Sequence, residues 1–151
     1  MSIGSWWRNR RKRKQALRAA FVKFLVKSPV KDVKFSKGCK RVSLAFLGGR
    51  VRYAVRVGRE AYVAEWSRRR PEIRVDAAML PRGSGRLREF RALCVHEAVE
   101  KHLAERYGLP ADREAHDVAT AKERQYLQRA GGDWRKHQAA VCRVWKRRGG
   151  H

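Results

Sequence analysis

KRVSLAFLGGRVRYAVRV, residues 40–57, is the stretch that decides the fold of this chain of 151 residues. Apolar residues alternate with other types on both sides of a glycine pair: Val42, Leu44 and Phe46 before it, and Val51, Tyr53, Val55 and Val57 after it. Alternation with a period of two puts these side chains on one face of a strand. The pair Gly48-Gly49 supplies the turn, so the stretch predicts a β-hairpin with one apolar face.

Neighbouring segments extend this hairpin into a sheet within residues 30–80. Residues 60–66 and 72–80 indicate two further strands, and Val33 and Phe35 are candidates for another. We expect an antiparallel sheet of about four strands with one apolar face. The outward positions of the hairpin are occupied by Arg50, Arg52 and Arg56. This second face is either the solvated side of the sheet or a side that contacts phosphates.

The N-terminal segment, residues 1–28, predicts a basic helical arm. Ser5 is a candidate N-cap, and Pro29 ends the helix. Apolar residues recur at helical spacing in the second half of the arm, namely at Leu17, Ala20, Phe21 and Phe24. We therefore expect the second half to pack on the body of the protein. The first half is too basic to pack and carries Trp6 and Trp7 at its tip.

Three helices are predicted after the sheet, which they follow through a loop at residues 81–86. The first spans residues 87–107, the second spans residues 111–130, and the third spans residues 134–148. Residues 29–151 are expected to form a single domain. The predicted fold class is α+β: an N-terminal helical arm, an antiparallel sheet of about four strands, and then three packed helices.

The formal charge of the chain is +24, from 38 Lys and Arg against 14 Asp and Glu. Such a charge favours polyanions as binding partners. The charge is unevenly distributed, because residues 1–59 carry a net +17 whereas residues 89–123 carry a net −3. A surface that binds nucleic acid does not need this acidic segment, but a cation site does.

No apolar run approaches the roughly 20 residues that a membrane span needs. Near the N terminus, Lys23 interrupts an apolar stretch, and no small-residue cleavage site follows it. We therefore expect an intracellular, cytoplasmic protein without a signal peptide or a membrane segment.

Three basic clusters are candidates for contact with nucleic acid. RNA is favoured over DNA, on a ribosome or in a virion, because the composition is similar to that of ribosomal proteins. The candidate residues are Trp6, Trp7, Arg8, Arg10, Arg11, Lys12, Arg13 and Lys14 in the arm, Arg50, Arg52 and Arg56 on the sheet, and Arg135, Lys136, Arg143, Lys146 and Arg147 on the last helix. The alternative is that each cluster is a solvated charged face. For the arm, the charge of the whole chain favours contact with phosphates, with the indoles either stacking on bases or filling an RNA or protein pocket.

Two histidines and two glutamates occupy central positions on the apolar faces of two predicted helices. His96 and Glu100 lie one turn apart on the first, and His116 and Glu123 lie two turns apart on the second. The link between these helices is short, so they are expected to be antiparallel neighbours. Buried groups of this kind need either a cation or a proton-sharing His–Glu network. Zinc suits the donors, with iron or manganese as alternatives. The other histidines, expected at the surface or the terminus, are His102, His137 and His151.

Residues 96–100 form the motif H-E-x-x-E, and A-H-x-x-A-T-x-x-E follows at residues 115–123. The first motif resembles the H-E-x-x-H helix of zincin metallopeptidases, with Glu in place of the second His. The two motifs together are similar to minimal zincin-like proteins of phages and archaea. The resemblance covers roughly residues 72–145. It implies that residues 72–80 form the edge strand before the active-site helix.

Carried over to this chain, the resemblance implies that His96, Glu100 and His116 ligate a metal and that Glu97 is the general base. Glu123 would be a further ligand or the partner that orients His116. Glu100 departs from the family pattern. A carboxylate there reduces the Lewis acidity of the metal, and two Glu with two His could close all four zinc positions, as in structural sites.

Two functions are compatible with these features. The first is a nucleic-acid-associated protein whose zincin-like metal-binding core is structural. The alternative is a metal-dependent hydrolase, most simply a zinc metallopeptidase. The position of Glu97 distinguishes them: a carboxylate facing an open cavity beside the metal favours the hydrolase, and one paired with an Arg favours the structural site.

Overall fold

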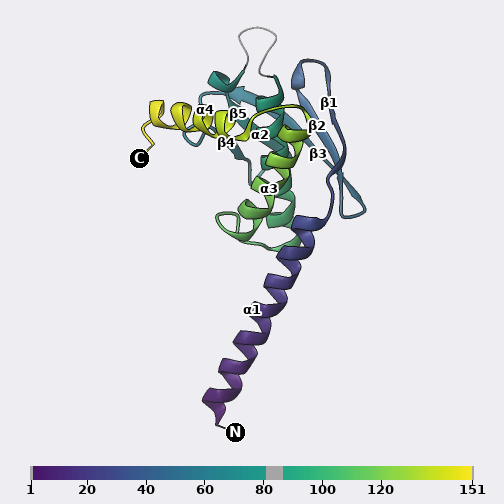
Figure 1. Cartoon of the computed structure of the whole chain (residues 1–151), viewed down its shortest axis with the longest axis vertical. Coiled ribbons are helices and arrows are strands. Elements are labelled where there is room, and N and C mark those ends of the chain that lie inside the picture. The colour runs from purple at the N-terminus through teal and green to yellow at the C-terminus, as the bar shows by residue number, and fades with distance from the viewer. Residues whose placement is uncertain (1, 81–86, 151) are drawn as a thin grey trace.

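The computed structural model describes residues 2–80 and 87–150 and confirms the α+β class (Figure 1). The helices are α1 (Ile3–Lys27), α2 (Leu87–Tyr107), α3 (Glu114–Arg129) and α4 (Trp134–Arg147). The strands are β1 (Lys31–Phe35), β2 (Arg41–Phe46), β3 (Gly49–Gly58), β4 (Ala64–Trp66) and β5 (Glu72–Asp76). Short 3₁₀ turns occur at Lys37–Cys39 and Ala77–Met79. The loop predicted at residues 81–86 and His151 lie outside the described residues.

The sheet has five strands in the order β1-β2-β3-β5-β4 and is mixed rather than wholly antiparallel. The chain leaves β3, forms β4, and then returns with β5 inserted between them, which makes β5 parallel to β3. The edge strand is therefore β4, not residues 72–80 as the resemblance implied. The predicted hairpin is confirmed, but its two-residue turn is Leu47-Gly48, where both residues have positive φ, as a type I′ turn requires.

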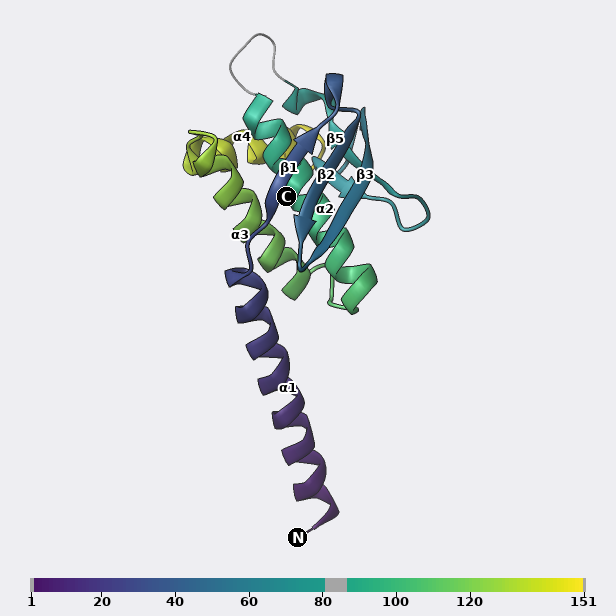
Figure 2. The ribbon, with the colours of Figure 1, turned by 90° about the vertical axis from the view of Figure 1, so that its right-hand side faces the viewer.

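Helix α2 lies along the inner face of the sheet, and α3 packs beside it as an antiparallel neighbour (Figures 1 and 2). The predicted apolar stripe of the hairpin faces this helix, since Val42, Leu44 and Phe46 are fully buried. Helix α2 is buried on most of its sides between residues 90 and 103. Tyr107 is 41% exposed, because it lies in the last turn, beyond the sheet.

Helix α1 projects from the body as an arm (Figures 1 and 2). It begins at a cap made by Ser2 rather than Ser5. Contact with the body starts at Arg18, which pairs with Glu114 at 3.7 Å, and becomes close toward the C-terminal end. There Leu25 is buried, and the ring of Phe21 lies 5.7 Å from that of Tyr107. The expectation that the whole second half packs is wrong for Leu17, Ala20 and Phe24, which are exposed, Leu17 to 72% and Phe24 to 58%. Among the described residues, no helix is long and apolar enough to cross a membrane.

A buried lysine fixes the base of this arm. The Nζ atom of Lys122 on α3 donates to the carbonyl oxygens of Val26, at 2.7 Å, and Ser28. These carbonyls belong to the end of α1, where the helix leaves backbone acceptors without partners and favours a positive charge. Lys122 is only 1% exposed, because the end of α1 covers it.

Candidate metal centre

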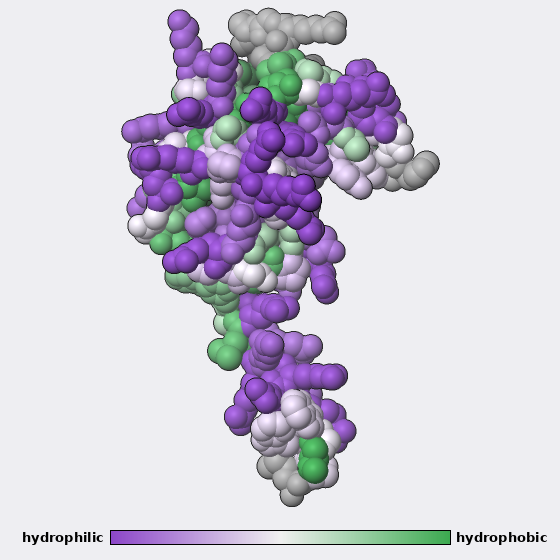
Figure 3. Space-filling model, turned by 180° about the vertical axis from the view of Figure 1, so that it is seen from behind, coloured by the Kyte–Doolittle hydropathy of each residue, from purple (hydrophilic) through white to green (hydrophobic). Residues whose placement is uncertain are grey.

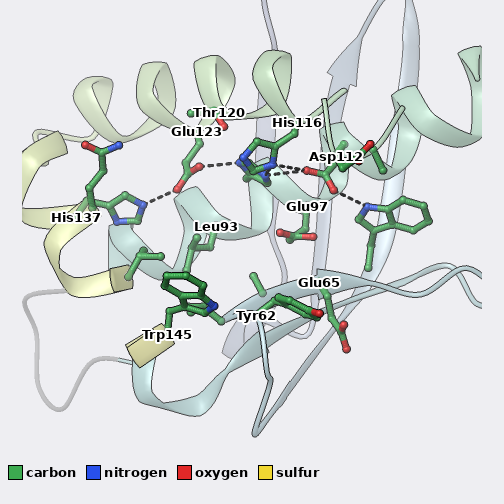
Figure 4. Close-up of a pocket in the computed structure, with 18 of the residues that line it drawn as sticks. Tyr62, Glu65, Leu93, Glu97, Asp112, His116, Thr120, Glu123, His137 and Trp145 are labelled. Atoms are coloured by element: carbon green, nitrogen blue, oxygen red, sulfur yellow. Dashed lines mark hydrogen bonds and ion pairs between the residues drawn. The ribbon is translucent and has the colours of Figure 1, made fainter. Parts of the chain in front are cut away.

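Three of the four predicted ligands come together where α2 and α3 lie side by side (Figure 4). The Nε2 atom of His96 lies 3.0 Å from Oε2 of Glu100 and 3.2 Å from Nδ1 of His116. The third edge of this triangle, from Nδ1 of His116 to Oε2 of Glu100, is 2.9 Å. We refer to His96, Glu100 and His116 as the triad.

The helices place the triad through simple geometry. His96 and Glu100 are one turn apart on α2, so their side chains project in the same direction. Helix α2 ends at Tyr107, and Gly108 follows it with a φ of 65°, which lets the chain turn back. His116, in the first turn of α3, therefore lies alongside α2. His96 is buried, whereas the side chain of His116 is 53% exposed. The triad is thus anchored in the core and open to solvent on one side.

The spacing of the three atoms fits a metal ion. Without a metal, Nε2 of His96 and Nδ1 of His116 would both donate hydrogen bonds to Glu100. Their two N–H groups would then repel each other, because the nitrogens are only 3.2 Å apart. A cation instead accepts a lone pair from each of the three atoms. Tetrahedral zinc, with bonds of about 2.0–2.1 Å to nitrogen, separates its ligand atoms by about 3.3 Å. The triad could therefore hold a metal ion.

Glu123 lies behind His96 rather than in the triad. Its Oε2 atom accepts from Nδ1 of His96 at 2.8 Å, and its Oε1 atom accepts from Nε2 of His137 at 2.6 Å. A carboxylate that takes the second ring N–H fixes the orientation of a ligating imidazole and raises its basicity. Of the two roles predicted for Glu123, this geometry favours the orienting one, and the partner is His96 instead of His116.

Two contributors to the site were not identified from the sequence. His137 was expected at the surface, but it is 1% exposed. Its position on α4, three residues after Trp134 and four before Val141, falls in that helix's apolar stripe, so the rule that identified His96 would have found it. The other is Trp66 on β4, whose indole Nε1 donates to Oε1 of Glu100 at 3.0 Å. No local pattern marks Trp66, because strand pairing alone brings it to α2.

The buried residue Lys101 holds Trp66 in place. The Nζ atom of Lys101 lies 5.1 Å from the centre of the Trp66 ring and donates to the carbonyl of Ser67 at 2.5 Å. Lys101 also pairs with Glu105, one turn further along α2. These contacts hold the end of β4 against α2, and with it the indole that orients Glu100.

The charges at the site suit a cation. Although burial lowers the pKa of His96, the carboxylates of Glu100 and Glu123 raise it to about 10. Burial opposes ionisation of Glu100, but hydrogen bonds from His116 and His96 lower its pKa to about 2. Within the described residues, neither Glu100 nor Glu123 pairs with a Lys or Arg. Glu123 is buried and Glu100 is largely buried, and imidazoles are the only cationic groups that pair with them. Negative charge is therefore left for a metal, which must displace a proton when it binds.

Glu97 faces a cavity of about 980 Å³ that opens beside the triad (Figure 4). Residue Glu97 is 6% exposed, and burial raises the pKa of its carboxyl to about 8 against the attraction of His96. In the described part of the chain it forms no ion pair with an Arg or Lys. The cavity lies between β4, α2, α3 and α4, and its walls are rich in aromatic residues, namely Tyr62, Trp66, Trp134 and Trp145.

The predicted nucleic-acid residues do not form one surface. Those of the arm are exposed along α1, those of the last helix are exposed along α4, and those of the hairpin lie across the body from α4 (Figure 1). On the hairpin, Arg50 pairs with Asp32, and Arg56 pairs with Glu72 at 3.2 Å. Internal ion pairs therefore neutralise part of the arginine face, while the arm and α4 keep their charge.

No protein-family model, curated protein or solved structure matches this chain.

Proposed function

We propose that this protein is a metal-dependent hydrolase, most simply a zinc peptidase. The observation that carries the proposal is the position of Glu97, whose carboxylate faces the open cavity beside the triad. A purely structural metal site does not need a buried carboxylate that lines a large cavity and has no ion pair with an Arg or Lys. Such a group is costly to bury, and function is the usual reason for keeping one.

The residues of the chain divide the chemistry between them. His96, Glu100 and His116 would hold the ion, with zinc favoured because imidazole and carboxylate donors suit it. The bound ion would supply Lewis acidity to a substrate carbonyl. Glu97 would take a proton from the water whose oxygen attacks the carbonyl carbon. It would then pass that proton to the amide nitrogen as the C–N bond breaks.

The shape of the cavity supports a peptide substrate. Strand β4 ends the sheet, so among the described residues no strand pairs with its outer backbone edge. Residues from Tyr62 to Trp66 line the cavity. An extended peptide can pair with such an edge through main-chain hydrogen bonds. The aromatic wall on α4, made by Trp134 and Trp145, would receive an apolar side chain.

Metal binding is tested first on the untagged full chain. We expect about one zinc per chain by elemental mass spectrometry for the wild type and for Glu97→Gln. Glu100→Ala and His116→Ala should each lose most of the metal. Asp117→Asn, an exposed carboxylate on α3, is the control and should keep it. Full metal content in both triad variants would show that these residues are not ligands.

Hydrolysis is tested with quenched fluorescent peptides that carry aromatic or aliphatic residues. Glu97→Gln should lower kcat/KM by at least a hundredfold while the metal content stays unchanged. The Asp117→Asn control should match the wild type. Full metal content without cleavage of any peptide would contradict the hydrolase and leave a structural metal site.

A further inference from the structure

We infer that α1 is an RNA-binding arm, in which basic side chains contact phosphates and the two tip tryptophans stack on unpaired bases. This inference is independent of the metal centre. It starts from the isolation of the helix, because residues 6–20 are exposed throughout (Figure 2). In this range Arg18 reaches the body through a solvent-exposed ion pair with Glu114, at 3.7 Å.

The exposed part of α1 is not stabilised by its own sequence. It carries no acidic residue, and like charges lie three or four residues apart at six places: 8–11, 8–12, 10–13, 10–14, 11–14 and 14–18. Each such pair destabilises a helix by roughly 0.2–0.5 kcal/mol. An isolated helix of this length is marginal in water even without that repulsion. A polyanion that neutralises the charges therefore stabilises the helical form of the arm.

The distribution of charge decides between a membrane and a nucleic acid. Residues 8–14 read RNRRKRK, so two full turns of α1 are basic on every side and lack an apolar residue. A helix that lies on a lipid surface needs an apolar face along its length. Figure 3 accordingly shows mostly hydrophilic side chains along this part of the arm. Charge around the whole circumference suits phosphates that approach from several sides.

The tip of the arm favours RNA with unpaired bases. Trp6 and Trp7 are 49% and 53% exposed, with ring centres 4.9 Å apart and an interplanar angle of 83°. The guanidinium of Arg10 lies 5.4 Å from the centre of the Trp6 ring and 5.7 Å from that of Trp7. Aromatic rings with a cation beside them can stack on bases that are not paired in a duplex. RNA loops offer such bases next to phosphates, and arginine-rich segments are among the modules that bind them.

The charge component is tested by matched variants of the full chain after nuclease treatment and a high-salt wash. The first replaces Arg10, Arg11 and Arg13 with Gln, and the second replaces Arg59, Arg106 and Arg113, which are exposed outside the arm. The probe is a fluorescein-labelled RNA hairpin with an eight-nucleotide loop, titrated by anisotropy at several salt concentrations. We expect the arm variant to bind roughly tenfold to fiftyfold more weakly at 0.15 M salt and to lower the salt slope by about 2. Equal losses in the two variants would overturn the arm as the binding element.

The stacking component has its own variant and its own probes. Trp6→Ala/Trp7→Ala should weaken binding to the hairpin by about tenfold or more while leaving the salt slope unchanged. Its affinity for a fully paired DNA duplex of equal length should not change. A hairpin affinity that survives this variant would overturn the stacking role. Wild-type binding to the DNA duplex, or to vesicles with anionic lipids, that equals binding to the hairpin would overturn RNA as the partner.

Discussion

The Oε2 atom of Glu123 on α3 lies 2.8 Å from Nδ1 of His96 on α2. The carboxylate thus holds the imidazole from the side opposite the triad, and His137 on α4 holds the carboxylate in turn. A chain of hydrogen bonds links three helices through the carboxylate of Glu123. The metal affinity of the site therefore depends on side chains that would not touch the metal.

Glu123→Gln tests this dependence. The glutamine amide has one acceptor oxygen and no charge, so it cannot accept hydrogen bonds from both His96 and His137. The ring of His96 therefore loses basicity and its fixed orientation. We expect zinc to bind about 10–100-fold more weakly, measured by competition with a chromophoric chelator. Gln128→Glu, a change at an exposed position of the same helix, is the control. An unchanged zinc affinity for Glu123→Gln would contradict the orienting role.

Trp66→Phe tests the other support of the triad. Phenylalanine keeps the aromatic contact with Lys101 but removes the 3.0 Å hydrogen bond from the indole to Glu100. We expect zinc affinity to fall by about tenfold with little change in the denaturation midpoint. Trp145→Phe removes an indole from the same cavity without touching the triad, and it should bind zinc as the wild type does. Equal zinc affinities for the two variants would count against Trp66.

The pair Asp76–Arg148 predicts a specific dependence of stability on pH. Arg148 donates to both oxygens of the buried carboxylate, at 2.8 and 2.9 Å, and lowers the pKa of Asp76 from 3.8 to about 2. Because the folded pKa lies below the unfolded one, the stabilisation is complete above about pH 4 and is lost as the pH falls toward 2.

Urea denaturation of Arg148→Gln between pH 2 and pH 6 checks this pair. We expect a loss on the order of 1–2 kcal/mol at pH 6 that shrinks toward pH 2, after allowing for solvent near the guanidinium. Arg147→Gln removes the same charge from an exposed neighbour and should leave stability unchanged. A loss for Arg148→Gln that stays constant with pH would show that the interaction is not ionic.

Lys122→Ala tests the anchor of the arm. The change leaves the carbonyls of Val26 and Ser28 without their donor, which costs roughly 1–3 kcal/mol of unfolding free energy. Amide exchange should also accelerate in the last turn of α1. Lys146→Ala, on the exposed side of α4, should change neither quantity. Slow exchange at the end of α1 in Lys122→Ala would mean that apolar packing alone holds the arm.

Local patterns predicted most elements of the fold. The alternation around Gly48 gave the hairpin, and the helical spacing of apolar residues gave α2 at its observed bounds of Leu87–Tyr107. The insertion of β5 between β3 and β4 could not be predicted this way. It depends on pairing between distant segments, and short connections normally favour antiparallel neighbours.

The residues of the candidate site also separate into those that local patterns predicted and those that depend on contacts between distant segments. His96, Glu100 and His116 each lie centrally on a predicted helical face, so antiparallel packing of two helices was enough to bring them together. Trp66 reaches Glu100 only through the placement of an edge strand, which no helical pattern encodes. For Leu17 the helical pattern predicted burial, but the side chain is exposed. An apolar stripe leads to burial only where another element is present to cover it.

The projecting arm also governs how the molecule diffuses. A helix of 25 residues adds about 37 Å of length to the body while contributing little mass. The frictional coefficient of the monomer is therefore higher than that of a sphere of 17.5 kDa. A single chain will sediment slowly and leave a gel-filtration column early, so an elution volume typical of a dimer is expected for the monomer. Light scattering, which reports mass independently of shape, is the appropriate measure of its oligomeric state.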